Sequence, residues 1–285
     1  MTTIALFGAG GKIGYRIAEK LRDSDYRGLY IEISPEGIAA LADMGVSVTA
    51  QHEALKEADV VILAVPDNLI GEIANQCAPH MKTGTMIMSL DAAAAFAGEL
   101  PKRDDLAYFV VHPCHPPIPS DETDPEARRD FFGGHKAKQS IVCSLIGGSE
   151  SDYALGDAVA RCIFGPVMRA HRLTIEQMAL LEPALAESIS ATCMVMVREA
   201  MCDVIKMGVP EQAALDFLLG HINVTIGIVF GFIDAEFSDG CKVAIHRAKG
   251  AMFRPGWKDV LQPENLRKEI EAITTFETVP EVMDC

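Results

Sequence analysis

The sequence predicts an α/β domain with a doubly wound parallel sheet, followed by an all-α domain. Three observations support this prediction. Short apolar runs alternate with helical patterns in the first half, a glycine cluster follows the first apolar run, and strand-like runs disappear after residue 173. Alternating strands and helices are typical of a parallel sheet covered on both faces. We therefore place the two domains at residues 1–172 and 173–285.

The predicted strands of the first domain follow one another at short intervals. The run at residues 58–66, "ADVVILAVP", is apolar almost throughout, as is usual for a parallel strand buried on both faces. The other predicted strands are at residues 3–7, 29–33, 46–49, 84–91, 107–113, 139–148 and 166–171. The predicted helices of this domain are at residues 14–23, 35–44 and 150–163.

The second domain is predicted to consist of helices alone. A single long helix is expected from residue 174 to Gly208, and shorter ones at 210–219, 223–237 and 263–275. The apolar run at 222–233 is too short to cross a bilayer, so we expect a buried core helix there.

Composition limits the partners and the compartment. The formal net charge of −15 argues against nucleic acid, which would require a basic face. Eight cysteines without C-x-x-C spacing are typical of reduced, mostly buried thiols in a cytoplasmic protein. The N-terminus resembles a strand rather than a signal peptide. We expect a cytoplasmic protein with neither a membrane nor a nucleic-acid partner.

The glycine cluster "FGAGGKIG" predicts a dinucleotide site. Gly8 permits the tight turn, Gly11 allows a pyrophosphate to approach the backbone, and Gly14 allows close packing of helix and strand. Lys12 and Ile13 lie just before the start of the predicted helix, which adds partial positive charge and N–H groups. A purely structural glycine turn is the alternative.

Two acidic residues extend this predicted site. Glu32 ends the second strand, where a carboxylate can accept hydrogen bonds from a ribose 2′-hydroxyl and would repel a 2′-phosphate, so NAD is favoured over NADP. Asp67 follows another strand at the same edge and is a secondary cofactor contact.

The segment "VVHPCHPPIPSDE" places two histidines at the end of a predicted strand. Proline follows both His112 and His115 and favours extended backbone before it. In an extended, polyproline-like run the two histidines would be about 9 Å apart. We therefore expect at most one of them to bind a metal ion, unless the chain turns sharply. A rigid loop with one solvated and one hydrogen-bonded histidine is the alternative.

Glu182 interrupts an apolar stripe of the long helix. The stripe has helical periodicity and comprises Ile175, Met178, Ala179, Leu185, Ala186, Ile189, Cys193 and Met196. A carboxylate there is costly unless it is paired, protonated or metal-bound. Pro183 follows and is expected to kink the helix. Glu182 is thus a candidate site residue, and pairing with an ordinary arginine is the alternative.

These motifs resemble the 6-phosphogluconate and β-hydroxyacid dehydrogenase superfamily over nearly the whole chain. Within it, "HPCHPPI", "LTIEQMALLEPALAE" and "HRAKGAMFRPGWKDVL" resemble the D-apionate oxidoisomerase family. The resemblance implies a Rossmann-type NAD-binding domain and a 6-phosphogluconate-dehydrogenase-like helical domain. The long helix has no lysine before Lys206, unlike β-hydroxyacid dehydrogenases with their catalytic lysine.

The resemblance also implies a reaction: NAD-dependent oxidation of a branched sugar acid to a rearranged 3-oxo acid by ketol migration. Such a migration needs a polarised carbonyl, which a divalent cation provides. We expect His112 and Glu182 to bind that cation, Zn or Mg, with His115 as acid/base or supporting group. The alternatives are a dehydrogenase of a small 2- or 3-hydroxy acid without rearrangement, and a dinucleotide-binding redox sensor without turnover.

A basic cluster stands out in this acidic chain. "HRAKGAMFR" carries Arg247, Lys249 and Arg254, which we predict to bind the substrate carboxylate, for which Arg is best suited. A solvated basic turn is the alternative. In the superfamily, C-terminal segments of one subunit complete the partner's site, so the resemblance implies a homodimer built on the helical domain.

Overall fold

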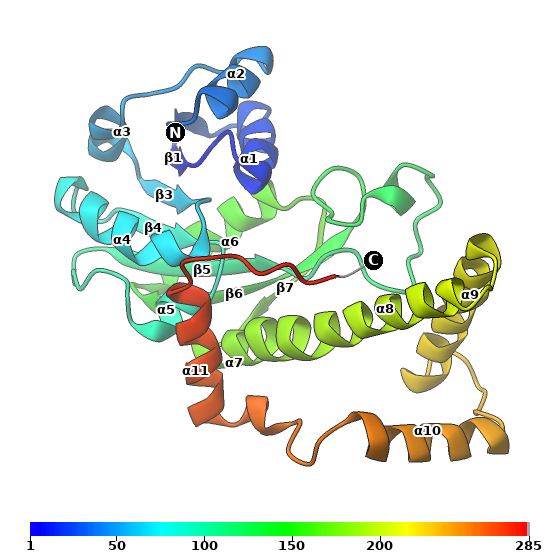
Figure 1. Ribbon diagram of the computed structural model, residues 1–285. Helices are drawn as coiled ribbons and strands as arrows, with labels where there is room; N and C mark the ends of the chain where they lie inside the picture. Colours follow the sequence, from blue (N-terminus) through cyan, green and yellow to red (C-terminus); the bar gives the residue numbers. More distant parts are fainter. Residues whose placement is uncertain (284–285) are drawn as a thin grey trace. The chain divides into compact units, whose positions relative to one another are not determined.

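A computed structural model describes residues 1–283 (Figure 1). The chain divides into two compact units, of which the first contains Met1–Glu182 and Arg267–Phe276. The second contains Pro183–Leu266 and the segment from Glu277 onward. Residues 173–182 and most of the last helix therefore pack with the first unit, whereas the sequence places them in the helical domain.

The first unit is built on a seven-stranded sheet with the order β2-β1-β3-β4-β5-β6-β7. Because the chain passes from β1 to β2 on one side and returns to β3 on the other, the strand order reverses at β1, where open α/β folds bind ligands. The strands are β1 Thr3–Phe7, β2 Arg27–Ile31, β3 Val60–Leu63, β4 Met86–Ser89, β5 Ala107–Pro113, β6 Gln139–Gly147 and β7 Val167–Arg172.

The predicted fold class is confirmed, with two differences in the sheet. Strand β6 runs antiparallel to β5, so the sheet is mostly but not wholly parallel. The strand predicted at residues 46–49 is reduced to a bridge between Tyr30 and Val48. This prediction was wrong because four residues after a helix suffice for one contact with β2 but not for a strand.

Helices cover both faces of the sheet and bury its alternate residues. The helices of this unit are α1 Lys12–Arg22, α2 Pro35–Asp43, α3 Gln51–Glu57, α4 Asp67–Cys77, α5 Ala93–Ala97, α6 Glu150–Ile163, α7 Ile175–Ala179 and most of α11 Pro263–Thr274. Ile4 and Leu6 of β1 belong to the cluster beneath α1 and α6, whereas Ala5 and Phe7 belong to the cluster beneath α3 and α4.

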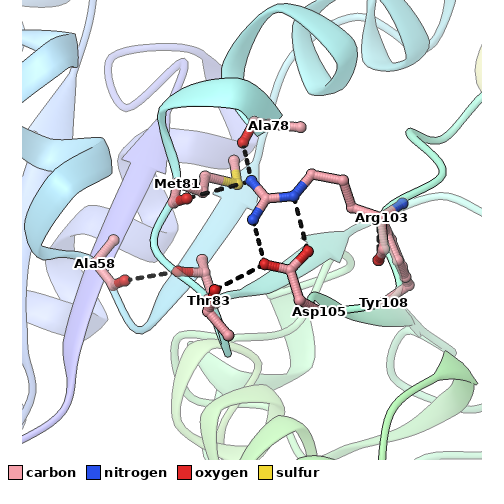
Figure 2. A network of polar contacts seen from close by, with 8 residues as sticks. Ala58, Ala78, Met81, Thr83, Arg103, Asp105 and Tyr108 are labelled. Carbon is pink, nitrogen blue, oxygen red and sulfur yellow. Dashed lines mark hydrogen bonds and ion pairs between the residues drawn. The ribbon is translucent and has the colours of Figure 1, made fainter.

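A network of polar contacts lies at the amino-terminal edge of the sheet (Figure 2). The guanidinium of Arg103 pairs with Asp105 and donates to the carbonyl oxygens of Ala78 and Met81. Thr83 donates a second hydrogen bond to Asp105, at 2.8 Å. The network thus joins the turn before β4 to the turn before β5, at the edge opposite the strand ends that carry the candidate site.

The long predicted helix exists but changes its winding in the middle. It runs as α7, then as a π-helix over Leu180–Ala191, and then as α8 Thr192–Lys206. The π-helix contains Pro183, which has no N–H to donate, and the Ser188 hydroxyl donates to the Pro183 carbonyl at 2.8 Å. Wide π-turns have a longer repeat than 3.6 residues. The predicted stripe therefore fails beyond this point, and Leu185 is 48% exposed.

The second unit leaves most of its helical surface uncovered. It contains α8, α9 Glu211–Val229 and α10 Asp239–Met252. A single helix α9 replaces the two predicted at 210–219 and 223–237, and only Ala214 in it is buried. The prediction of a buried core helix at residues 222–233 is therefore wrong for the isolated chain. By length and composition, Ile175–Lys206 and Glu211–Val229 would be able to cross a membrane.

The cysteines only partly follow the prediction of buried, reduced thiols. Cys77, Cys143 and four others carry free thiols, and of these six only Cys77 and Cys143 are buried. Cys202 is disulfide-bonded, which corrects the expectation at that position. Cys285 lies outside the described residues.

Candidate active site at the carboxyl edge of the sheet

The glycine turn joins β1 to α1 and needs glycine for steric reasons. Gly8 has φ +67°, and a Cβ there would lie 2.3 Å from the Ala64 carbonyl oxygen. A Cβ on Gly14 would lie 1.9 Å from the Gly8 carbonyl oxygen. At Gly11, by contrast, an added Cβ would meet only that oxygen, at 3.2 Å. Gly8 and Gly14 thus shape the turn, and Gly11 leaves space at the helix start beside Lys12 and Ile13.

Glu32 lies against this turn, as predicted for a residue at the end of β2. Its carboxylate accepts from the N–H groups of Gly10, at 2.8 Å, and of Ile33 and Ser34. Burial would raise the pKa of Glu32, but these backbone hydrogen bonds hold it below its usual value. The side chain of Ser34 is a further hydrogen-bond partner of this carboxylate. A charged acid here also disfavours a 2′-phosphate.

Glu182 and His112 meet at the carboxyl end of β5. Glu182 Oε1 lies 2.7 Å from His112 Nδ1, and the Leu90 carbonyl oxygen lies 2.9 Å from the same nitrogen. Burial alone would lower the pKa of His112, but Glu182, Leu90 and Asp91 raise it to about 9. Both neighbours of Nδ1 are acceptors, so Nδ1 carries a proton. The buried carboxylate of Glu182 is therefore paired with the predicted imidazole, and not with an arginine, which was the alternative.

Asp91 completes a cluster that the sequence analysis did not identify. Ligand atoms of Asp91, His112 and Glu182 all lie within 4.8 Å of one another. Burial, together with the charge of Glu182 and a hydrogen bond with it, raises the pKa of Asp91 to about 7. Glu182 Oε2 is buried without a hydrogen-bond partner among residues 1–283. The cluster thus has more acidic oxygens than donors.

Asp91 stands in the sequence directly after "MSL", at the end of an apolar strand. The same rule that singled out His112, a polar side chain at the carboxyl end of a parallel strand, was the signal that would have identified it.

Asp67 adds a further carboxyl group to the same edge. It opens α4, and burial together with the neighbouring charge of Asp91 raises the pKa of Asp67 to about 6. The positive charge of His112 acts in the opposite direction. Asp67, predicted as a cofactor contact, thus belongs electrostatically to the acidic cluster.

His115 departs from the extended geometry expected before proline. It has φ +59°, and the rings of His112 and His115 are 6.1 Å apart between centroids, with their planes nearly perpendicular. The predicted separation of about 9 Å was wrong because the chain turns at His115. His115 Nδ1 lies 3.0 Å from the Phe132 carbonyl oxygen. Among the described residues only His112 joins a potential metal cluster, in keeping with one histidine ligand.

A cavity of about 210 Å³ opens beside these two histidines. Its wall includes the start of α1 and the segment between β5 and β6. The residues that line it are Lys12, Ile13, Arg16, Ile17, Leu90, His112, Pro113, His115, Phe132, Gly133, Gly134, Gln139, Ile163 and Phe164. The cavity therefore connects the predicted cofactor turn with the predicted catalytic histidines.

The predicted substrate-binding cations belong to the second unit. Arg247 and Lys249 lie on the exposed helix α10, and Arg254 follows it. The basic segment is thus the end of a helix and the residues after it, and not the turn that was the alternative.

Comparisons with known proteins agree with this architecture. Residues 1–117 match the family "Acetohydroxy acid isomeroreductase, NADPH-binding domain", and residues 120–274 match "Phosphogluconate dehydrogenase (decarboxylating) C-term". The D-apionate oxidoisomerase of Rhizobium rhizogenes is 52% identical over 96% of this chain and all of its own length. That of Cupriavidus necator is 53% identical over 95% of this chain and 99% of its own.

The chain belongs to the D-apionate oxidoisomerase family. This confirms the family predicted from the three segments, and it places the chain among oxidoreductases with a Rossmann-type domain. A solved structure, a semialdehyde dehydrogenase NAD-binding protein from Cupriavidus necator in complex with calcium and NAD, has a TM-score of 0.93 at 52% identity. It covers 96% of this chain and 100% of its own.

A more distant likeness shows the fold alone. An NADH-preferring ketol-acid reductoisomerase from an uncultured archaeon has a TM-score of 0.63 at 16% identity, over 96% of this chain and 82% of its own.

Proposed function

We propose that this protein is an NAD-dependent oxidoisomerase that converts D-apionate, or a similar branched sugar acid, to a rearranged 3-oxo acid, 3-oxo-isoapionate. Family membership supports the substrate class, and the NAD-bound relative supports the cofactor. The observation that carries the proposal is the cluster of Asp91, His112 and Glu182 beside the cavity. It is an acid-rich site in place of the lysine of ordinary β-hydroxyacid dehydrogenases.

The glycine turn and Glu32 fit NAD. Gly8, Gly11 and Gly14 with the first helical residues, Lys12 and Ile13, would hold the pyrophosphate, and Glu32 would accept from the adenosine ribose. NAD supplies an acceptor for the hydride that leaves the carbinol carbon during oxidation. The hydroxyl proton leaves in the same step, and we assign its acceptance to His115, which lines the cavity next to His112.

The acidic cluster fits a divalent cation. A buried carboxylate oxygen of Glu182 lacks a hydrogen-bond partner among the described residues, and the crowded acids make a positive charge favourable there. One imidazole with two carboxylates suits Zn²⁺ or Mg²⁺, and three protein ligands leave positions open for substrate. A bound cation supplies polarisation of the substrate carbonyl during carbon migration. Leu90 fixes the ring of His112 through its carbonyl oxygen.

The second unit supports a homodimer. Large apolar side chains are exposed along α8, α9 and α10, among them Phe217 at 70% and Phe230 at 69%. Apolar exposure of this extent on neighbouring helices is typical of an interface. A second copy covers these helices in our proposal, which keeps the protein soluble in the cytoplasm without a membrane partner. Arg247, Lys249 and Arg254 stay proposed substrate-binding residues, on the basis of their charge in an acidic chain.

The test of the proposed function is a screen of branched and linear aldonates for NADH formation, with identification of the product. The expected result is NADH formation with a branched aldonate and a rearranged 3-oxo acid. An unrearranged keto acid would instead indicate a simple dehydrogenase of a 2- or 3-hydroxy acid. NAD binding without turnover of any aldonate would indicate a redox sensor and reject the enzyme.

A further inference from the structure

The cavity beside the two histidines has cations on one wall and, among its described lining residues, no aspartate or glutamate. Lys12 and Arg16 lie one turn apart on the same face of α1. Neither makes an ion pair within residues 1–283. In a chain with a formal net charge of −15, two such cations on one cavity wall indicate an anionic ligand.

Lys12 and Arg16 differ in their place on the helix. Lys12 is exposed and is the first residue of α1, so it lies beside the glycine turn proposed for the cofactor phosphates. Arg16 is half-buried and one turn deeper, away from the free N–H groups of the helix start. The cofactor phosphates therefore account for Lys12 but not for Arg16.

The segment between β5 and β6 holds the guanidinium of Arg16. The carbon of the guanidinium lies 5.0 Å from the centre of the Phe132 ring, and one nitrogen donates to the Gly133 carbonyl oxygen at 3.4 Å. This is the single hydrogen bond of Arg16 in the described chain. Since a guanidinium has five N–H donors, four remain, which is enough for a bidentate carboxylate.

The same segment fixes the ring of His115. Phe132 packs edge-on against His115, with 5.7 Å between ring centroids, and its carbonyl oxygen lies 3.0 Å from His115 Nδ1. A Cβ on Gly133 would lie 2.7 Å from the side chain of buried Gln139. Gln139 Oε1 has no hydrogen-bond partner among residues 1–283, so this wall retains an unused buried acceptor.

We infer that Arg16 binds the carboxylate of the sugar acid, with Phe132 as the aromatic surface that positions the guanidinium. This inference rests on the proposed function and specifies how the substrate is oriented in the cavity. The carboxylate at Arg16 and the reacting carbons at His112 and His115 would occupy the same cavity. Sugar acids would then be preferred over neutral sugars and polyols of the same shape.

The experiment compares Arg16→Gln, Arg16→Lys and the control Arg22→Gln in the full-length protein. Arg22 lies on the same helix, is exposed, and pairs with its neighbour Asp23. We expect Arg16→Gln to raise the KM for the aldonate about 10–100-fold, as for loss of one charged carboxylate contact, while the KM for NAD stays within about 2-fold. Arg16→Lys should recover part of this loss, because a point charge replaces the bidentate fork.

Each other outcome decides against the inference. An unchanged aldonate KM in Arg16→Gln, with a large rise in Arg254→Gln, would move the carboxylate to the second unit and leave the proposed function intact. A rise in the KM for NAD alone would assign Arg16 to the cofactor. Absence of aldonate turnover in the unaltered protein would reject the proposed function and this inference together.

Discussion

Two ionic clusters lie at opposite edges of the same sheet and differ in how their charges are balanced. At the amino-terminal edge, Arg103 and Asp105 pair, with further hydrogen bonds to Thr83 and backbone carbonyls (Figure 2). At the carboxyl edge, Glu182 and Asp91 crowd around a single imidazole. Hydrogen bonds from Arg103 and Thr83 lower the pKa of Asp105 to about 2, whereas burial and Glu182 raise that of Asp91 to about 7.

The difference indicates that the first cluster has a structural role and the second a chemical one. The first cluster is solvent-exposed and complete within the chain, so it contributes modestly to stability and needs no further group. The second leaves a buried carboxylate oxygen without a hydrogen-bond partner among the described residues, which is costly unless something else binds there. Ionisable groups with perturbed pKa values next to a cavity are typical of active sites.

The largest effect is expected from Glu182→Gln. The substitution keeps the shape of the side chain and removes the charge that pairs with His112 and that we propose to bind the cation. We expect kcat for the aldonate to fall by at least about 100-fold, in the range for loss of a catalytic group. Thermal unfolding should show a stability equal to or above that of the unaltered protein. Activity within a few-fold of normal would contradict the role of this acid.

A smaller effect is expected from Asp91→Asn, which removes a proposed metal ligand and leaves the pair of Glu182 and His112. The affinity for the divalent cation should fall about 10–100-fold, as measured by equilibrium dialysis, and activity should recover at high metal concentration. Asp157→Asn, at an exposed ion pair of α6, is the control and should bind the cation normally.

The pH dependence of stability provides a third comparison. Because Asp91 has a raised pKa, the metal-free folded state retains a proton that the unfolded state loses, so stability falls as pH rises from about 4 to 7. The raised pKa of His112 continues this fall up to about pH 9. We expect the Tm of the metal-free protein to decline from about pH 4 to pH 9. In Asp91→Asn the decline should be less steep up to pH 7. Equal slopes in the two proteins would contradict the assignment.

The smallest effect is expected at the opposite edge. Asp105→Asn removes the ion pair with Arg103, and because its pKa is lowered, the stability it adds is present above pH 4 and lost towards pH 2. At pH 7 the Tm should fall by only about 2–4 °C, with kcat and KM unchanged. A loss of activity here would remove the contrast between the two edges.

The sequence predicted the elements with strong local signals. Glycine spacing predicted the turn between β1 and α1, where a Cβ on Gly14 would collide with the Gly8 carbonyl oxygen and a Cβ on Gly8 with that of Ala64 after β3. The apolar strands and the order of the two domains followed from composition. The pairing of Glu182 with His112 was predictable because a buried acid requires a partner and a strand end offered one.

Other features depend on long-range packing that periodicity does not encode. The π-helix around Pro183 changed which residues face the core, and the positive φ of His115 overrode the preference before proline. Helix α9 was expected to be buried because it is apolar, but Ala214 is its one buried residue. Asp91 was missed because a single acid after an apolar strand is a weak signal until its neighbours are known.

A cation held by the cluster of Asp91, His112 and Glu182 is the central element of the proposed reaction. The direct measurement is the product formed from D-apionate and NAD by metal-free protein, with metal content verified by elemental analysis, before and after addition of Zn²⁺ or Mg²⁺. We predict that the rearranged 3-oxo acid disappears on chelation and returns on addition of the ion. Undiminished rearrangement by protein shown to contain no divalent metal would contradict the account.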